Sequence, residues 1–184
     1  MKFVKNIITF AFVIALLLLI NRWYLGWFSK IEVVEKKIGP YTIAYTEFTG
    51  KYSKVGPAME KIYQELSGQG ITQLAGIGIY YNDPATITSG QELRSDVGSV
   101  VDEKDVGKLQ RNSSVYKVKT IPQAVRVVAE FPYKNSFSYM VGPIKMYPLV
   151  NKYMAARAYK LEIPRIELYD MDMKKIYFIA DVVK

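Results

Sequence analysis

The chain of 184 residues contains no cysteine and no histidine. Without cysteine, the fold can hold neither a disulfide nor a thiolate nucleophile. Without histidine as well, zinc sites built from cysteine and histidine and catalytic triads of the Ser-His-Asp type are excluded. Any chemistry must rest on carboxylates, tyrosines, lysines or backbone groups, and we expect no metal and no cofactor.

Acidic residues are also few, since 17 of them stand against 25 basic residues and give a net charge of +8. Four of the basic residues lie in the first thirty positions, which contain no acidic residue, so the remainder carries only about four net positive charges. These charges are scattered, and no helix-turn-helix, zinc or single-strand-binding pattern accompanies them. We therefore predict no nucleic-acid partner, and residues 1–30 leave no room for a DNA-binding domain.

The first thirty residues instead predict a membrane anchor. An almost unbroken apolar run covers Ile7–Ile20, and both tryptophans of the chain, Trp23 and Trp27, follow it. Tryptophan favours the membrane–water interface, and Arg22 could snorkel to that interface, so the apolar element extends over residues 7–28. Because no small-x-small cleavage site follows the run, residues 1–30 predict an uncleaved, single-pass anchor with the lipid bilayer as its partner.

The charges on the two sides of the anchor favour opposite orientations. Lys2 and Lys5 favour an N-terminus inside the cell, which would export the following domain to the periplasm or the extracellular space. Arg22 and Lys30 favour the opposite, cytoplasmic side. The balance of these charges favours the exported side.

The remainder of the chain, residues 31–184, predicts one α+β domain with an internal duplication. Its order is strand-strand-helix-strand-strand, twice, which predicts one antiparallel sheet with two helices on one face. Because Pro143 and Pro148 would each remove a hydrogen bond from a helix, we place Pro148 in the first turn of the second helix. The expected strands cover 31–36, 41–48, 77–81, 97–101, 116–119, 124–131, 165–169 and 175–182, and the expected helices cover 52–66 and 148–160.

One late strand, Pro164–Asp170, carries the best candidate for a site. Alternation places Ile166 and Leu168 on one face, and Arg165, Glu167 and Tyr169 on the other. A carboxylate among apolar neighbours tends to have a raised pKa and could bind a cation or transfer a proton.

A weak internal repeat supports this choice, because it aligns Gly78–Asp83 with Arg165–Asp170. In that alignment Tyr80 and Glu167 occupy equivalent places beside a pseudo-twofold axis. Clefts between the two halves of a duplicated fold are common ligand sites.

The order and spacing of several short motifs resemble the GyrI-like small-molecule-binding domain, which also serves as the effector-binding half of several multidrug-responsive regulators. The motifs are Gly39-Pro40-Tyr41, Phe48-Thr49-Gly50-Lys51-Tyr52, Ile79-Tyr80-Tyr81-Asn82-Asp83-Pro84 and Pro164-Arg165-Ile166-Glu167-Leu168-Tyr169. The likeness covers about residues 31–184. A narrower set, with Val97-Gly98-Ser99, Phe131-Pro132-Tyr133 and Tyr147-Pro148-Leu149, resembles a testis-expressed, membrane-anchored ER-phagy receptor of that family, although the long disordered tail of that receptor is missing here.

The resemblance implies a central groove for flat, apolar and often cationic ligands. Glu167 matches the glutamate that lies in this groove in the family, and Tyr80, Tyr81 and Tyr169 match aromatic positions near it. These four residues are therefore our candidate ligand-binding residues. A sub-branch of the family hydrolyses strained electrophiles with such a glutamate.

Three functions agree with these patterns. The first is a membrane-tethered, sensor-type domain that binds an apolar, cationic small molecule around Glu167. The second is a hydrolase of strained electrophiles, with Glu167 as the general base. The third is a membrane scaffold that grips a protein or a lipid headgroup. We favour the first, because tyrosine faces and a desolvated carboxylate select cations without any chemistry.

Overall fold

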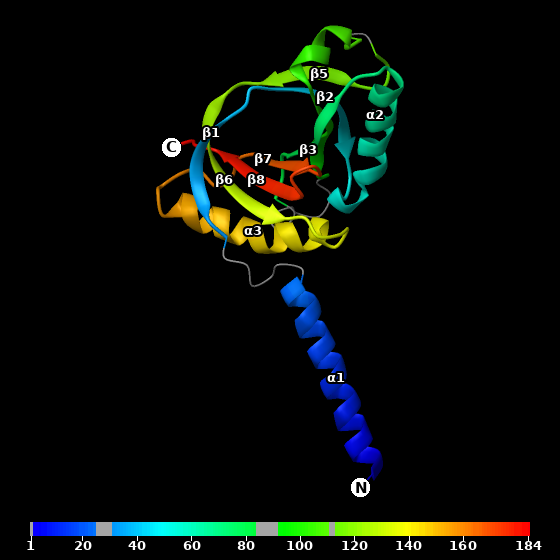
Figure 1. The fold of residues 1–184 in the computed structure, drawn as a ribbon. Coiled ribbons are helices and arrows are strands. Elements are labelled where there is room, and N and C mark those ends of the chain that lie inside the picture. Colours follow the sequence, from blue (N-terminus) through cyan, green and yellow to red (C-terminus); the bar gives the residue numbers. More distant parts are fainter. Residues whose placement is uncertain (1, 25–30, 84–91, 111–112) are drawn as a thin grey trace.

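The computed structural model describes residues 2–24, 31–83, 92–110 and 113–184 (Figure 1). A helix, α1 (Lys2–Tyr24), precedes the domain, whose elements follow in the predicted order. These are β1 (Val33–Ile38), β2 (Tyr41–Thr49), η1 (Tyr52–Lys54), α2 (Gly56–Gly68), β3 (Gln73–Tyr80), β4 (Arg94–Val101), η2 (Glu103–Lys108), β5 (Lys117–Ile121), β6 (Ala124–Pro132), α3 (Ser138–Ala155), β7 (Arg165–Asp170) and β8 (Lys175–Asp181).

The strands form one curled antiparallel sheet in the order β1-β6-β8-β7-β3-β4-β2-β5. The first unit (β1 to β4) and the second (β5 to β8) occupy equivalent places in this sheet. If each strand is replaced by its counterpart in the other unit, the same order results, read from the opposite edge. A pseudo-twofold axis therefore runs between β3 and β7. The first strand of each unit pairs with a strand of the other unit, since β1 pairs with β6 and β5 pairs with β2. The predicted duplicated α+β architecture is confirmed.

The two faces of the sheet have different covers. On the helix face, α3 lies against β6 and β8, and α2 lies against β2 and β4 (Figure 1). There α3 packs over Phe131 and Phe178, and α2 packs over Ala44. The inner face of the curl carries a separate cluster of buried aliphatic residues that includes Ile77 and Ile166. Along β7, alternation places Ile166 and Leu168 on the inner face and the residues between and after them on the helix face, as predicted.

The helix α3 begins ten residues earlier than Pro148, so the predicted start was wrong. Both Pro143 and Pro148 lie inside it. Each proline removes one hydrogen bond, to the carbonyl groups of Tyr139 and Ile144, and such a loss costs about 3 kcal/mol. Tyr139 and Ile144 are 45% and 58% exposed, so both residues lie on the exposed side of the helix. Burial of the opposite side of the helix against the sheet offsets the cost.

The predicted membrane span over residues 7–28 is not confirmed. Within the part of the chain that the structure describes, no helix has both the length and the apolar character needed to cross a bilayer. Residues 25–28 of the predicted span lie outside the described residues, as do 29 and 30. The described large apolar side chains of α1 are exposed, for example Phe10 at 69% and Phe12 at 68%.

Candidate functional site

Glu167 lies in the middle of β7, on the helix face and beside the pseudo-twofold axis. In the sheet its neighbours are Gly78 of β3 on one side and Phe178 of β8 on the other. The residue is only 5% exposed, so the carboxyl group is buried rather than solvated. A buried carboxyl at a symmetry axis is the feature that the sequence predicted.

The symmetry partner of Tyr80 is Tyr169, and the predicted equivalence of Tyr80 with Glu167 was wrong by two residues. Tyr80 pairs with Ser95, the second residue of β4, and Tyr169 pairs with Ile176, the second residue of β8. Counting along the same strands makes Gly78 the equivalent of Glu167. The site therefore has one carboxyl group and, in the other half, a glycine.

The absence of a side chain at Gly78 makes room for Tyr80. A Cβ atom at position 78 would lie 2.7 Å from the ring and the hydroxyl of Tyr80. Only glycine therefore allows this tyrosine to lie flat against β3. Its ring fills the place that a second carboxyl would occupy in a fully symmetric site.

Tyrosine hydroxyl groups hold both oxygens of Glu167. Tyr147 of α3 donates a hydrogen bond to Oε1, and Tyr169 donates to Oε2 at 2.8 Å. The hydroxyl of Tyr80 lies 2.8 Å from that of Tyr169. Because the Tyr169 proton points to the carboxyl group, Tyr80 donates to Tyr169. The structure thus brings together three of the four predicted residues, and adds Tyr147.

Glu167 has no counter-charge within the described part of the chain. Among the described residues, no lysine or arginine makes an ion pair with it. Arg165, two residues earlier on the same strand, donates instead to Asn151 Oδ1 at 2.9 Å and to the carbonyl of Leu161 at 2.8 Å. Within the described residues, no three acidic side chains gather in a way that could hold a metal ion.

The buried position controls the protonation of the site. Burial raises the pKa of Glu167 above its usual range, and the hydrogen bonds from Tyr147 and Tyr169 oppose that rise only in part. Burial and the nearby carboxylate also raise the pKa of both tyrosines well above the ordinary value. The hydroxyl groups therefore remain neutral donors at physiological pH.

This raised pKa predicts that the domain becomes less stable as the pH rises. The folded state holds the Glu167 proton at a pH where the unfolded chain has lost it. The free energy of unfolding should therefore be greatest below the unfolded pKa and should fall through the window up to the folded pKa. Urea unfolding from mildly acidic to neutral pH should show this slope in the parent and not in Glu167→Gln.

Glu130 provides a control, because the pKa of this carboxylate is shifted in the opposite direction. The hydrogen bond from Lys175 lowers the pKa of Glu130, so its contribution is lost as the pH falls through the folded pKa. Glu130→Gln should leave in place the slope between the unfolded and folded pKa of Glu167. Identical slopes for the parent and Glu167→Gln would contradict the assignment.

Aromatic rings from several elements surround the Glu167 carboxyl. The ring of Tyr52 lies 4.7 Å from that of Tyr80, and the rings of Tyr139 and Tyr169 are 5.5 Å apart. Tyr147 meets Phe178 edge-on at 5.5 Å. The 3-10 helix η1 and the helix α3 thus supply aromatic walls that the strands alone would lack.

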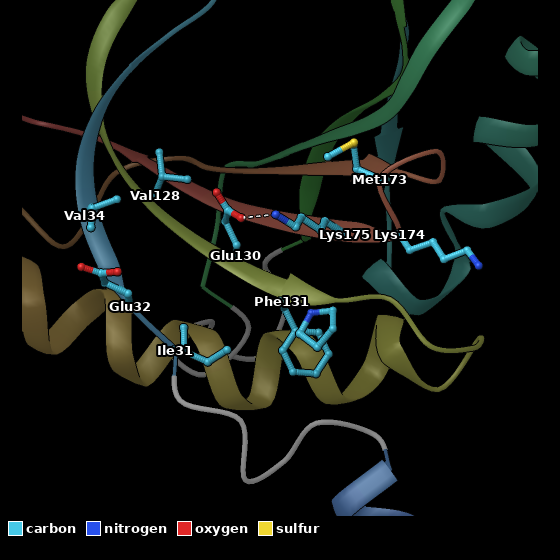
Figure 2. A pocket seen from close by; sticks show the side chains of 10 residues that line it. Ile31, Glu32, Val34, Val128, Glu130, Phe131, Met173, Lys174 and Lys175 are labelled. Carbon is cyan, nitrogen blue, oxygen red and sulfur yellow. Dashed lines mark hydrogen bonds and ion pairs between the residues drawn. The ribbon is translucent and has the colours of Figure 1, made fainter.

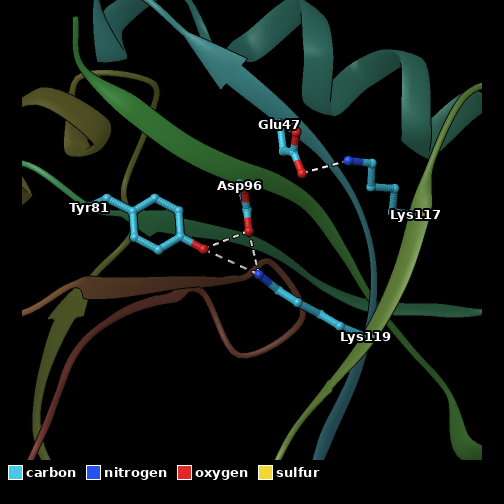
Figure 3. A network of polar contacts seen from close by, with 5 residues as sticks. All are labelled: Glu47, Tyr81, Asp96, Lys117 and Lys119. Carbon is cyan, nitrogen blue, oxygen red and sulfur yellow. Dashed lines mark hydrogen bonds and ion pairs between the residues drawn. The ribbon is translucent and has the colours of Figure 1, made fainter.

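Tyr81 lies away from this group, on the inner face. Its hydroxyl donates to Asp96 Oδ2 at 2.7 Å, and Lys119 forms an ion pair with the same oxygen (Figure 3). Lys119 Nζ also lies 4.2 Å from the centre of the Tyr45 ring. The structure therefore separates Tyr81 from Glu167, with the sheet between them.

Two open hollows lie beside β1 and across the inner face. The larger, about 450 Å³, has Ile38, Tyr41, Leu168 and Tyr177 among its lining residues. The smaller, about 420 Å³, lies at the beginning of β1, where Lys175 pairs with Glu130 (Figure 2). Leu168 lines the larger hollow from the face opposite to Glu167, so neither hollow is the groove predicted around Glu167.

Two residues beside the carboxyl group, Tyr147 and Phe178, were missed by sequence reasoning. Tyr147 was missed because the helix was expected to begin one residue later. A helix continued back through Pro148 would have placed Tyr147 next to Met146, on the covered side. Phe178 reads as an ordinary core residue, and only the strand register shows that it lies opposite Glu167.

Comparison with known proteins supports one family. The profile of the GyrI-like small molecule binding domain matches residues 31–179. No curated protein matches the chain, so the resemblance to the ER-phagy receptor is not supported.

Solved structures show the same fold. The crystal structure of the EcmrR C-terminal domain is similar with a TM-score of 0.60 and 15% identity, over 84% of this chain and 98% of that chain. The cryo-EM structure of the EcmrR–DNA complex is similar with a TM-score of 0.62 and 14% identity, over 98% of this chain and 69% of that chain. SAV2435 bound to tetraphenylphosphonium is similar with a TM-score of 0.49 and 12% identity, over 82% of this chain and 93% of that chain. A TM-score of this size does not establish a shared fold.

Proposed function

Because the chain belongs to the GyrI-like small-molecule-binding family, we propose that it binds an apolar, cationic small molecule at the Glu167 cluster. We define this cluster as Glu167 with Tyr80, Tyr147, Tyr169 and Phe178. The observation that carries the proposal is a buried carboxyl group whose oxygens accept hydrogen bonds from neutral hydroxyls and have no counter-charge among the residues that the structure describes. A cationic ligand would supply the missing charge in a place where water cannot.

The aromatic surroundings of Glu167 favour the same class of ligand. Tyrosine and phenylalanine faces attract a cation by about 0.5–2 kcal/mol each, and more when water is excluded. The rings of Tyr80, Tyr147, Tyr169 and Phe178 all belong to the cluster. A large, delocalised cation would use both the charge and the apolar area.

Space for such a ligand would come from the rotation of side chains. On the helix face of β3, Gly76 and Gly78 form a flat floor, on which Tyr80 and the flexible Met59 now lie. Rotation of Tyr80 away from this floor would expose a surface suited to a planar ring, directly beside Glu167. The cluster is therefore a closed site that a ligand opens by displacing a tyrosine.

The same geometry favours binding over hydrolysis. A general base must reach the water molecule that it activates. Both oxygens of Glu167 already accept tyrosine hydrogen bonds, and the residue is 5% exposed. Activation of water there would require both tyrosines to leave.

Titration with tetraphenylphosphonium tests the proposal. The full chain should bind this cation, and Glu167→Gln should weaken binding about tenfold or more, since loss of a charged partner costs about 1.5–3 kcal/mol. Glu130→Gln, which removes a salt-bridged carboxylate at the smaller hollow, should bind like the parent. Equal affinity of the parent and Glu167→Gln would rule out this site.

We also propose that α1 attaches the domain to a lipid bilayer, and Lys2 and Lys5 at the start of the chain favour the exported side for the domain. The support is the row of exposed apolar side chains on α1, which includes Ile8, Phe10 and Phe12. Flotation of the full chain with phospholipid vesicles should show attachment, and Ile8→Asp combined with Phe12→Asp should abolish it. Equal flotation of the variant and the parent would contradict this part of the proposal.

A further inference from the structure

The helix α3 is apolar on the side that faces away from the sheet. Phe137, at its N-terminal cap, Met140 and Ile144 are 60%, 58% and 58% exposed, at spacings of three and four residues. Pro148 and Ala155 continue this exposed row, with the exposed Lys152 between them. We call these five apolar residues the outer stripe of α3. A surface helix normally turns charged residues to this side, so an apolar outer stripe is typical of a helix with a further partner.

The charged residues of α3 and of the segments on either side of it in the sequence all have one sign. Between Phe131 and Leu161 the sequence contains no acidic residue. The same stretch holds five basic residues, namely Lys134, Lys145, Lys152, Arg157 and Lys160. Arg157 forms an ion pair with Glu35 of β1 at 3.5 Å, and the other four basic residues are lysines. An apolar strip with basic flanks and no carboxylate of its own matches the interface of a bilayer with anionic lipids, where apolar side chains enter the headgroup region and lysines meet the phosphates.

The path of the chain brings α3 close to α1. Ile31, where the described part of the domain begins, packs against the same cluster as the inner side of α3, and Figure 2 shows it beside this helix. Residues 25–30 connect Tyr24 to Ile31, and this number of residues can span at most about 25 Å. A bilayer that holds α1 is therefore within reach of α3.

We propose that the outer stripe of α3 rests on the surface of the bilayer to which α1 attaches. Phe137, Met140 and Ile144 enter the interface, and the flanking lysines face anionic headgroups. The inference rests on attachment through α1, and it is independent of ligand binding at Glu167. It also gives the ligand a route, because Tyr147 projects from the same helix onto Glu167, so that an apolar cation dissolved in the bilayer meets the cover of the site.

The absence of cysteine makes the test direct, because a single introduced cysteine carries the only label. A polarity-sensitive fluorophore is attached to Met140→Cys or Ile144→Cys in the full chain. The matched control is Tyr63→Cys, at a residue of α2 that is 53% exposed and belongs to the other half of the domain. Each protein is mixed with vesicles of phosphatidylcholine, with or without phosphatidylglycerol.

On the vesicles with phosphatidylglycerol, the labels at 140 and 144 should shift to the blue and should be quenched by lipids brominated in their chains. The label at 63 should do neither. Labels at 140 and 144 that remain as solvated as the label at 63, on vesicles that carry the protein, would overturn the proposal. A failure of the chain to bind vesicles would overturn it too, while leaving tetraphenylphosphonium binding at Glu167 unaffected. A blue shift that needs no lipid and grows with protein concentration would assign the stripe to a second copy of the chain.

Discussion

Replacing Gly98 with alanine should destabilise the domain by at least about 4 kcal/mol, an exceptional effect for one methyl group. Gly98 lies in the middle of β4 and pairs with Tyr45 on one side and Ile77 on the other. A Cβ atom there would lie 1.9 Å from the carbonyl oxygen of Ala44 and 2.8 Å from Cα of Tyr45. Both are backbone atoms of β2, so no rotation of a side chain relieves the clash. The strands would have to separate, with loss of their hydrogen bonds.

Urea unfolding measures this loss, and Gly107→Ala is the matched control. Gly107 lies in η2, and a Cβ atom there would meet nothing within 4 Å. The control should unfold within about 0.5–1 kcal/mol of the parent. If the two variants unfolded at similar urea concentrations, the close approach of β2 to β4 would be wrong.

Phe178→Ala should cost about 3–5 kcal/mol, as expected for a large aromatic residue removed from a core. Phe178 is 1% exposed, and it lies in β8 between Ala129 and Glu167 of the neighbouring strands. Its ring also contacts Tyr147 of α3 edge-on. The substitution therefore removes the packing between the sheet and α3 at the point where Tyr147 reaches the carboxyl group.

Thermal or urea unfolding detects the effect of Phe178→Ala, and Val125→Ala serves as the control. Val125 lies in β6 and is 51% exposed, so its truncation should change the free energy of unfolding by less than about 1 kcal/mol. If Phe178→Ala lowered the free energy of unfolding no more than Val125→Ala does, α3 would not pack as described.

Much of the fold followed from local sequence patterns. The alternation along β7 correctly predicted which side chains share a face, and the repeated element order predicted the duplication. The exchange of β1 and β5 between the halves was not predicted, because pairing between distant strands leaves no mark on local periodicity. The start of α3 was wrong because tertiary packing overrode the helix-breaking tendency of two prolines.

The site was predicted in part for similar reasons. Tyr80, Tyr169 and Glu167 meet as expected, because they share one face of neighbouring strands. Tyr81 follows Tyr80 directly, so the pleat of the strand turns it to the other face, and alternation alone could have shown this. The pairing of Gly78 with Glu167 depends on strand register, which a single sequence does not encode.

The most direct test of the central claim is the number of protons released when the full chain binds tetraphenylphosphonium. Calorimetric titrations at a series of pH values above the ordinary carboxyl pKa, each in two buffers with different ionisation enthalpies, measure this number. A cation beside Glu167 favours the ionised carboxylate, so the parent should release up to one proton per ligand and bind more tightly as the pH rises toward the raised pKa. Glu167→Gln should release none and bind weakly. Equal affinity and equal proton release in the two proteins would show that the cation binds elsewhere.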